Sequence, residues 1–513
     1  MALPHRKGRP RKRVSVAVVD LGKTEAALVA ARHENLAALR SRGTDPFAAT
    51  RYSVDASIAE LSEKYAFLVP EQRAESELWS VAGRVMSLRR MGKTIFADLQ
   101  DRTGRLQVYV RKDELGAEKF ADWTDLDAGD ILGVHGFMFR SKMGELTLHV
   151  RSFAILSKAL APLPDKWHGL VDVEKRYRQR YVDLIVNPEV RDTFIARSRI
   201  LAEMRRFIDS YGFYEVETPA LLHLAGGAAA RPFITHSRAL DQEMQLRIAT
   251  ELNLKRLIVG GMERVYEIGR IFRNEGIDTT HNPEFTMLEL YAAYWDVSDM
   301  MEFNEALIAH LVSAVTGGRE ELRIGEEIVS FKRPFRRIEY FDALRKHGNY
   351  SREQLLDPKT AATILHGLGL PPSPSHGHAL DKIFERVLEP HLIEPVFITG
   401  YPTLISPLAK RRKGDPEVTD RYELFCDSME ISNAFTELND PEDQRARFDL
   451  QALQRAEGDE EIPPPDWDFV RALEYGMPPT AGIGIGVDRL VMLLTGQKSV
   501  RDVLLFPMQR QHG

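Results

Sequence analysis

The spacing of apolar residues divides the chain into regions of different texture. Residues 21–42 carry alanine and leucine at helical intervals and end before Gly43, a pattern that predicts a helix. Between residues 79 and 157 the pattern becomes the short alternation of strands, in the segments WSVAGRVMSL, TIFADLQD, GRLQVYV, GDILGVHGFMF and GELTLHV. About five such strands within about 80 residues are typical of a small closed barrel, most commonly the nucleic-acid-binding OB barrel.

From residue 172 onward, helical and strand patterns are mixed, which predicts an α+β domain. An amphipathic helix is predicted over residues 194–210, followed after Gly212 by the strand YEVETP. The apolar stripe of that helix is predicted to hold Ile195, Leu201, Met204, Phe207 and Ile208. We interpret residues 338–374 as a helical insertion and the acidic, proline-rich stretch AEGDEEIPPPDW as a surface loop.

Two strands of this domain carry charged residues among apolar ones. In the segment VYEIGRIFRNE, strand alternation places three charged residues on one face, namely Glu267, Arg273 and Glu275. In FTMLELYAAY, the shared face holds Phe285, Met287, Glu289 and Tyr291. A surface sheet with one polar face, or an internal network of ion pairs, explains one such strand. Several in succession favour a ligand site, because buried charges are costly unless they are paired or bound.

A third strand, MEISNAFTELN, repeats the pattern with Asn433, Phe435 and Glu437 on one face. Glu430 has the opposite parity. It reaches the same face only if the strand bulges near Ile431 or its neighbour Ser432.

The stretch TAGIGIGVDRLVMLLTG has glycine at alternate positions of a strand, then a helix that carries Arg489. Glycines allow a ligand or backbone to approach closely, and a helix N-terminus favours phosphate. The spacing differs from the dinucleotide-binding fingerprint, because the third glycine comes one residue too early.

Composition narrows the class of protein. The chain has 513 residues, of which 43% are hydrophobic, and a formal net charge of -6, typical of a globular protein with two or three domains. The lone Cys426 excludes an internal disulfide. No uninterrupted apolar run is long enough to span a bilayer, so we expect a cytoplasmic protein without a membrane partner. Basic residues crowd the first 13 positions, as in a nucleic-acid-binding arm or a disordered tail.

Three sequence blocks resemble the motifs of class II aminoacyl-tRNA synthetases. The blocks FRNE and HNPEF, at 272–275 and 281–285, are similar to motif 2, and GIGIGVDR at 482–489 is similar to motif 3. The long helix and the strand ending at Pro219 resemble motif 1, which builds the dimer interface in that class. Similarity to lysyl-tRNA synthetases specifically is carried by GGAAARPFITH, NPEFTMLELY, ELNDPEDQ and EYGMPPT, in a match from about residue 21 to 510.

The resemblance implies an α+β fold in which an N-terminal OB-fold β-barrel precedes a class II synthetase catalytic domain built on an antiparallel sheet flanked by helices. The implied parts are a basic tail (1–20), a helical segment (21–78), an anticodon-binding barrel (79–160) and the catalytic domain (172–513). The implied reaction is activation of lysine with ATP to lysyl-adenylate, then transfer to tRNA(Lys), by a homodimer.

Residue roles follow from the same resemblance. The implied ATP-binding residues are Arg273, Glu275, His281, Phe285 and Arg489, of which Arg273, Glu275 and Arg489 are catalytic. The implied Mg²⁺ ligands are Glu423 and Glu430. The implied lysine-binding residues are Gly227, Glu251, Glu289, Tyr291, Asn433, Phe435 and Glu437. The implied anticodon contacts are Arg89, Phe96, Gln107 and Glu145.

The acidic residues of the implied pocket match lysine chemically. Lysine has two ammonium groups, so carboxylates must meet both of its ends. An aspartyl or asparaginyl enzyme would instead need cationic or amide groups at the side-chain end, since an anion buried against Glu289 and Glu437 is strongly disfavoured. In the barrel, Phe96 shares a face with Thr94 and Asp98, where an aromatic ring can stack on a base.

One residue departs from the family pattern. Thr280 precedes HNPEF where the family usually has arginine, which puts the handling of ATP phosphates or of the acceptor stem in question. The alternatives are an inactive or specialised paralogue that binds RNA or regulates, and a relative that lysylates a protein or a lipid. An N-terminal barrel disfavours protein lysylation, and the absence of fused membrane segments disfavours lipid lysylation.

Overall fold

The computed structural model describes residues 25–164, 170–456 and 462–510, which form two compact units divided between Gly169 and Leu170. Outside the described residues lie the predicted basic tail (1–20), the first four residues of the helix predicted over 21–42, and residues 457–461 of the predicted acidic loop. No helix in the described ranges is both long and apolar enough to cross a bilayer.

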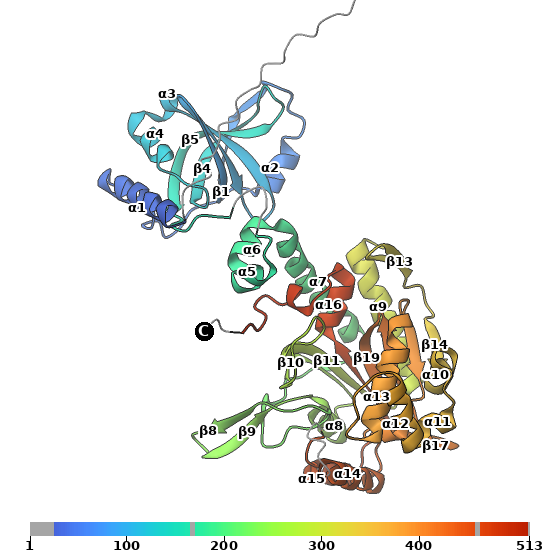
Figure 1. Cartoon of the computed structure of the whole chain (residues 1–513). Coiled ribbons are helices and arrows are strands. Elements are labelled where there is room, and N and C mark those ends of the chain that lie inside the picture. Colours follow the sequence, from blue (N-terminus) through green and yellow to red (C-terminus); the bar gives the residue numbers. More distant parts are fainter. Residues whose placement is uncertain (1–24, 165–169, 457–461, 511–513) are drawn as a thin grey trace, which may run out of the picture. The chain divides into compact units, whose positions relative to one another are not determined.

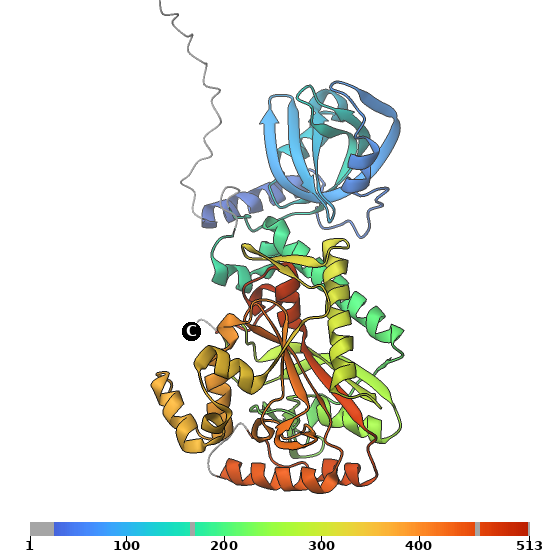
Figure 2. The ribbon, with the colours of Figure 1, turned by 90° about the vertical axis from the view of Figure 1, so that its right-hand side faces the viewer.

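The N-terminal unit is built on a closed barrel, shown in blue in Figure 2. Its strands follow the order β1-β2-β3-β5-β4 and comprise β1 (Arg73–Met91), β2 (Thr94–Gln100), β3 (Arg105–Arg111), β4 (Ile131–Arg140) and β5 (Leu146–Ser157). Its helices are α1 (Glu25–Ser41), α2 (Ile58–Lys64), α3 (Lys112–Leu115) and α4 (Ala117–Thr124). The helix predicted over 21–42 is found as α1, and Gly43 after it has a φ of 82°, a left-handed conformation that suits glycine. The inward residues of β2 are fully buried, as alternation predicted.

The C-terminal unit is built on an eight-stranded sheet in the order β14-β15-β18-β19-β20-β11-β10-β6 (Figure 1). The strands are β6 (Tyr214–Glu215), β10 (Arg264–Phe272), β11 (Glu284–Ala293), β14 (Arg336–Glu339), β15 (Val396–Thr399), β18 (Arg421–Cys426), β19 (Met429–Thr436) and β20 (Thr480–Gly486). Neighbouring strands are antiparallel except at β10–β6 and β14–β15. The expected fold, an N-terminal OB-fold barrel before an antiparallel sheet flanked by helices, is confirmed.

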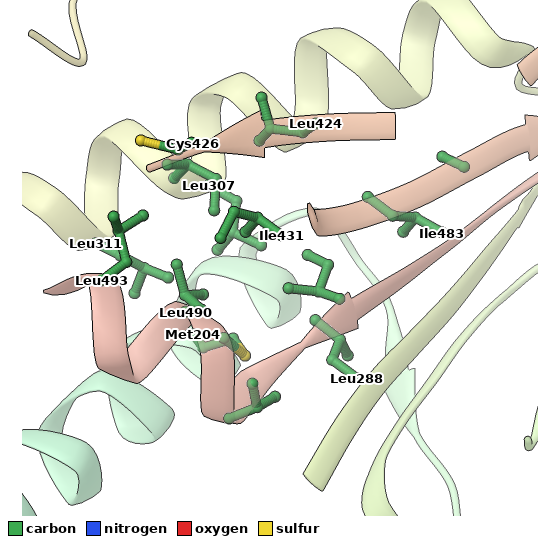
Figure 3. Close-up of a cluster of buried hydrophobic side chains, with 14 of the residues drawn as sticks. Met204, Leu288, Leu307, Leu311, Leu424, Cys426, Ile431, Ile483, Leu490 and Leu493 are labelled. Carbon is green, nitrogen blue, oxygen red and sulfur yellow. The ribbon is translucent and has the colours of Figure 1, made fainter. Parts of the chain in front are cut away.

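One face of this sheet is covered by α7 (Pro188–Ser210), α9 (Val297–Thr316) and α16 (Val487–Thr495). Figure 3 shows Met204, Leu307 and Leu490 of these helices packed against Leu288 and Ile483 of the sheet. All five side chains are 1% exposed or less. Burial of this face leaves the opposite face of the sheet available for polar side chains.

The stripe predicted on α7 is partly wrong. Met204 and Ile208 are buried as expected, but Ile195 is 40% exposed, and Phe194 and Ile200 are buried instead. Helical spacing from Met204 leads to Ile200 rather than to Ile195, so the stripe was placed on the wrong side in the first turns. The predicted strand YEVETP is also shorter, since only Tyr214–Glu215 forms strand.

The segment after β14 is helical and has a core of its own. It contains α10 (Tyr340–Gly348), α11 (Arg352–Leu356), α12 (Pro358–Gly367) and α13 (His376–Val387). Tyr340, Leu365, Leu380 and Phe384 of these helices share one apolar cluster. Helix α13 therefore belongs to the same packed body, although it lies beyond the predicted limit at residue 374.

The remaining elements complete the chain. They are the helices α5 (Val173–Arg178), α6 (Arg180–Val186), α8 (Glu251–Val259), α14 (Pro441–Ala456), α15 (Trp467–Glu474), η1 (Glu389–His391), η2 (Thr403–Ile405) and η3 (Val500–Asp502), and the strands β7 (Leu221–Leu222), β8 (Ile234–Ser237), β9 (Gln242–Leu246), β12 (Glu321–Ile324), β13 (Glu327–Ser330), β16 (Arg411–Arg412) and β17 (Asp415–Thr419). Of these, α8 bears directly on the site described next.

Candidate active site

A cavity of about 500 Å³ lies against the polar face of the eight-stranded sheet. It is lined by α8, by strands β11, β18, β19 and β20, and by the loop between β10 and β11. All residues proposed from sequence for ATP, lysine and metal binding line it: Gly227, Glu251, Arg273, Glu275, His281, Phe285, Glu289, Tyr291, Glu423, Glu430, Asn433, Phe435, Glu437 and Arg489. Residues separated by up to 262 positions in the sequence (Gly227 to Arg489) are thus brought to one place.

Alternation along β11 directs its polar and aromatic side chains into the cavity, as predicted. The neighbouring strand β20 faces them with glycine. A Cβ atom at Gly482 would lie 2.2 Å from Oε1 of Glu437 and 2.3 Å from the ring of Tyr291, and one at Gly484 would lie 2.4 Å from Met287. These separations are far below contact distance. Gly482 is required for the Tyr291 ring to keep its place, whereas at Gly484 the end of the flexible Met287 side chain would have to move.

The bulge predicted in β19 is confirmed. Leu424 of β18 lies opposite Ser432, but its neighbour Phe425 lies opposite Glu430, so Ile431 is the extra residue. An extra residue reverses the alternation of the strand beyond it. Glu430 therefore reaches the cavity together with Asn433, despite their opposite parity in the sequence.

The prediction for β10 is partly wrong. The strand ends at Phe272, so Arg273 and Glu275 enter the cavity from the following loop rather than by strand alternation. Glu267 does not line the cavity: it forms an ion pair with Arg247 at 2.5 Å and accepts hydrogen bonds from Thr218. Glu267 therefore belongs to an internal ion pair, as in the ion-pair interpretation of that strand, and not to a ligand site.

Cations gather at one end of the cavity. The Cζ of Arg273 lies 5.2 Å from the ring centroid of Phe285, and its Nε donates to the carbonyl of Ile248 at 3.2 Å. Burial lowers the pKa of Arg273, which Glu275 opposes. Arg489 donates to the carbonyl and to Oε2 of Glu430, at 3.1 and 3.2 Å.

His281 connects Arg489 to the loop that contains Thr280. Arg489 lies 3.1 Å from Nε2 of His281, and Nδ1 of the same ring lies 2.8 Å from Oδ2 of Asp278. Since arginine only donates, Nε2 accepts and Nδ1 carries the proton. Burial opposes ionisation of Asp278, but hydrogen bonds from Thr280 and His281 outweigh it and lower its pKa to about 2.

Carboxylates gather beside the cations. Glu423 is held by Arg421 and by the hydroxyl of Tyr401, which donates at 2.7 Å. Burial and then the charge of Glu430 raise the pKa of Glu423, while Arg421 opposes the rise. Asp381, on α13, also lines the cavity, and burial raises its pKa to about 7.

Another part of the cavity is an acidic pocket. Glu289 accepts a hydrogen bond from the amide of Thr250 at 2.9 Å and one from the hydroxyl of Tyr291 at 3.2 Å. Burial and then the charge of Glu251 raise the pKa of Glu289 to about 7. Burial also raises the pKa of Glu437, and Lys255 opposes that rise.

Sequence reasoning missed two cations of this site. Lys255 is paired with Glu251 and Glu437. Arg421 donates to Oδ1 of Asn433 at 3.0 Å and binds Glu423. The spacing of Glu251 and Lys255, four residues apart on the apolar side of a helix, was a signal for a buried ion pair. Arg421 is two residues before Glu423, the spacing that places both side chains on one face of β18, and this signal was overlooked.

In the barrel, the proposed anticodon residues occupy β1, β2, β3 and the β4–β5 turn. Arg89 lies opposite Phe96 in the β1–β2 pairing, and the ring of Phe96 lies 4.8 Å from that of Tyr109. Gln107 is buried and donates to Glu145 at 2.5 Å. The barrel thus presents an aromatic pair beside an exposed arginine, with Gln107 engaged inside the protein.

Comparison with known proteins agrees with both units. The sequence-family model described as tRNA synthetases class II (D, K and N) matches residues 172–510. The family model described as OB-fold nucleic acid binding domain matches residues 79–156. A lysine–tRNA ligase of Halalkalibacterium halodurans is 51% identical over 486 residues, which are 94% of this chain and 97% of the relative. Lysine–tRNA ligases of Staphylococcus saprophyticus and Bacillus subtilis are each 50% identical, over 94% of this chain and 98% and 96% of the relatives. The chain therefore belongs to the lysine–tRNA ligase family of the class II tRNA synthetases.

Proposed function

We propose that this protein is a lysine–tRNA ligase, which activates lysine with ATP and transfers the lysyl group to the 3′ end of tRNA(Lys). One observation carries the proposal: a single cavity joins the cationic end, with Arg273 and Arg489, to an acidic pocket containing Glu289 and Glu437. A triphosphate suits the first end and a diamino acid suits the second. The comparisons support the same substrate, and nothing in them favours an inactive paralogue or another acceptor.

The chemical step is attack by a carboxylate oxygen of lysine on the α-phosphorus of ATP, with pyrophosphate as the leaving group. We assign Arg273 to the α-phosphate and the lysine carboxylate, because a planar guanidinium can bind two anions at once. Arg489 would bind the γ-phosphate, and Phe285 would stack on adenine. Glu275 and His281 would contact the nucleotide. Catalysis of this kind rests on positioning and charge neutralisation rather than on a side-chain nucleophile.

The carboxylates beside these arginines fit Mg²⁺. Glu423 and Glu430 supply hard oxygen donors, and their mutual repulsion, which raises the pKa of Glu423, is the kind that a divalent cation relieves. Bound Mg²⁺ would neutralise phosphate charge on ATP. In the protein itself, Arg421 and Tyr401 orient Glu423, and Arg489 orients Glu430.

The lysine pocket is assigned by charge. Glu251 and Gly227 would meet the α-amino end, where Gly227 adopts a φ of 88° and leaves room beside Glu251. Glu289, Tyr291 and Glu437 would meet the side-chain ammonium. Asn433 and Phe435 complete the wall between the two ends.

The N-terminal barrel is assigned to the anticodon of tRNA(Lys). Phe96, backed by Tyr109, would stack on a base, and Arg89 would add a contact with the nucleic acid. Gln107 and Glu145 stay in the proposed set, although they bind each other in the free protein. We assign residues 79–160 to this barrel and 172–513 to catalysis.

Two further assignments stay proposals. A homodimer through motif 1 is supported by the exposure of Ile195 on α7 and of Tyr214 on β6, which are 40% and 69% exposed. A cytoplasmic location is expected for an enzyme that charges tRNA.

The direct test is aminoacylation. Purified protein is incubated with ATP, Mg²⁺, radiolabelled lysine and total bacterial tRNA, and acid-insoluble lysine is counted. Lysyl-tRNA that accumulates and is discharged by mild base supports the proposal. If the protein activates lysine but labels only a protein or a lipid fraction, the acceptor has been assigned wrongly.

A further inference from the structure

Lys255 lies behind the acidic pocket, and none of the roles assigned so far uses it. The residue is 0% exposed on α8. Its Nζ forms an ion pair with Oε1 of Glu251 at 2.5 Å and another with Oε2 of Glu437. The rings of Phe435 and Phe469 lie 5.4 and 5.8 Å from the same nitrogen. A fixed cation therefore joins two carboxylates that reach the pocket from α8 and from the end of β19.

The pocket needs such a cation for electrostatic reasons. Glu251, Glu289 and Glu437 all line the cavity and are all buried. Buried carboxylates close together cannot all ionise, so without a cation some of them would share protons. A protonated oxygen donates a hydrogen bond, and a donor cannot receive an ammonium group.

The ammonium of Lys255 takes the place of that shared proton. Its positive charge offsets one of the three carboxylate charges of the pocket. Three negative charges and one positive charge leave two negative charges, the number that the two ammonium groups of lysine neutralise. A monoamino acid would leave one buried carboxylate without a partner, which is a costly state.

The same contact directs Glu437. Lys255 occupies its Oε2, while Oε1 has no hydrogen-bond partner among the described residues. Gly482 makes room for Oε1 itself, since a Cβ atom there would lie 2.2 Å from this oxygen. Oε1 is thus a buried acceptor without a partner among the described residues, on a residue that lines the cavity, and an ammonium group of a ligand can supply that partner.

We propose that Lys255 is a positioning residue that determines specificity for a diamino acid, because its ammonium pairs with Glu251 and Glu437, offsets one of the three carboxylate charges of the pocket and leaves one oxygen of Glu437 for the substrate. This inference rests on the proposed function. Lys255 itself does not touch the substrate.

The test compares two buried lysines. Lys158, in the N-terminal unit, is also buried and pairs with Asp127 and with Asp130, the latter at 2.9 Å, so Lys158→Met also leaves two carboxylates without their cation. Thermal unfolding and lysine-dependent ATP–pyrophosphate exchange without tRNA are measured for Lys255→Met, Lys158→Met and the wild type. Both variants should lose stability. Only Lys255→Met should raise the KM for lysine, by roughly 100-fold, with the KM for ATP within about twofold of wild type.

A pH series distinguishes positioning from a structural role. Lys255→Met leaves three close carboxylates without their cation, so its KM for lysine should fall as the pH rises above neutrality, more steeply than that of the wild type. The titratable groups that face Glu251 and Glu437 are Glu289, Tyr291 and Lys255. An unchanged lysine KM in folded Lys255→Met, or an equal rise in Lys158→Met, would overturn the proposal.

Calorimetry on the wild type covers the case in which Lys255→Met does not fold. Lysine binding is titrated at about pH 8 in buffers of different ionisation enthalpy, which gives the number of protons released. Because Lys255 already replaces the shared proton, close to none should be released, and release of a full proton would contradict the inference. If the wild type shows no lysine-dependent exchange at all, the proposed function is wrong. If the wild type shows exchange but the KM, pH and calorimetry results differ from those expected, only the role of Lys255 is wrong.

Discussion

The guanidinium of Arg273 lies over the ring of Phe285, with 5.2 Å between Cζ and the ring centroid. Arg273 follows directly after β10, and Phe285 is the second residue of β11, so the β10–β11 connection brings the two together. The stacking holds the guanidinium plane next to the ring that is proposed to bind adenine. A cation placed in advance costs little to position when ATP binds.

Replacing Arg273 with alanine should abolish adenylate formation. The change removes two charge-assisted contacts, to the α-phosphate and to the lysine carboxylate, which are together worth about 3–6 kcal/mol, or roughly 150- to 25,000-fold in rate. Lysine-dependent pyrophosphate exchange measures this loss. Arg270→Ala is the matched control, because Arg270 lies on the same hairpin, is exposed and forms an ion pair with Glu284 at 3.5 Å. Exchange near the wild-type rate in Arg273→Ala would remove the role given to Arg273.

The sequence predicted those parts of the site in which strand alternation decides side-chain direction. The cavity face of β11 followed from period two, and the need for a bulge near Ile431 followed from the parity of Glu430 against Asn433. The barrel was predicted for the same reason, since its inward positions alternate regularly.

Two of the missed contacts join different segments, Lys255 with Glu437 and Arg247 with Glu267, whereas Lys255 also pairs with Glu251 inside one helix. Glu267 shares the parity of Arg273, but its strand ends at Phe272, and a partner 20 residues earlier, Arg247, decides where its carboxylate goes. Lys255 and Arg421 form ion pairs with carboxylates of the site. The sequence pattern predicted those carboxylates as site residues but did not predict their cationic partners. Local periodicity describes one element at a time, so it cannot show which cation meets which anion.

Lysine binding should depend on pH near neutrality. In the free pocket, burial and the charge of Glu251 raise the pKa of Glu289 to about 7. An ammonium group binds the ionised form, so below about pH 7 a proton must leave first, and the KM for lysine should rise up to about tenfold per pH unit. Above that pH the KM should level off. The other groups against Glu289 are Thr250 and Tyr291, which donate to it.

Glu289→Gln provides the control for this profile. The amide cannot ionise, so the variant should have a high lysine KM that no longer changes between about pH 6 and about pH 8. A wild-type profile that is flat below neutral pH would show that Glu289 is already ionised or does not face the ammonium group.

Phe96→Ala should weaken tRNA charging by about 1–3 kcal/mol, the usual contribution of one stacked base, and leave lysine activation unchanged. The ring of Phe96 packs on Tyr109 at 4.8 Å. Met91→Ala, at a site 64% exposed at the end of β1, is the control and should not alter charging. A fall in tRNA-free exchange for Phe96→Ala would mean that the ring has a structural role.

Thr280→Arg should hold or raise the charging rate, because it adds a cation to the loop beside the phosphate-binding residues. The amide of Thr280 donates to Asp278 at 2.7 Å and its hydroxyl at 3.1 Å. Arginine keeps the first bond and loses the second. Initial rates of aminoacylation at saturating lysine test this, and a clear loss would show that the loop is adapted to threonine and its contact with Asp278.

The most direct test of the central claim is ATP–pyrophosphate exchange with each standard amino acid in turn and no tRNA. We predict exchange with lysine alone, because only lysine brings a second ammonium group of the right reach to the pocket of Glu251, Glu289 and Glu437. Exchange with a different amino acid, or with none, would contradict the assignment of the acidic pocket and of lysine as the substrate.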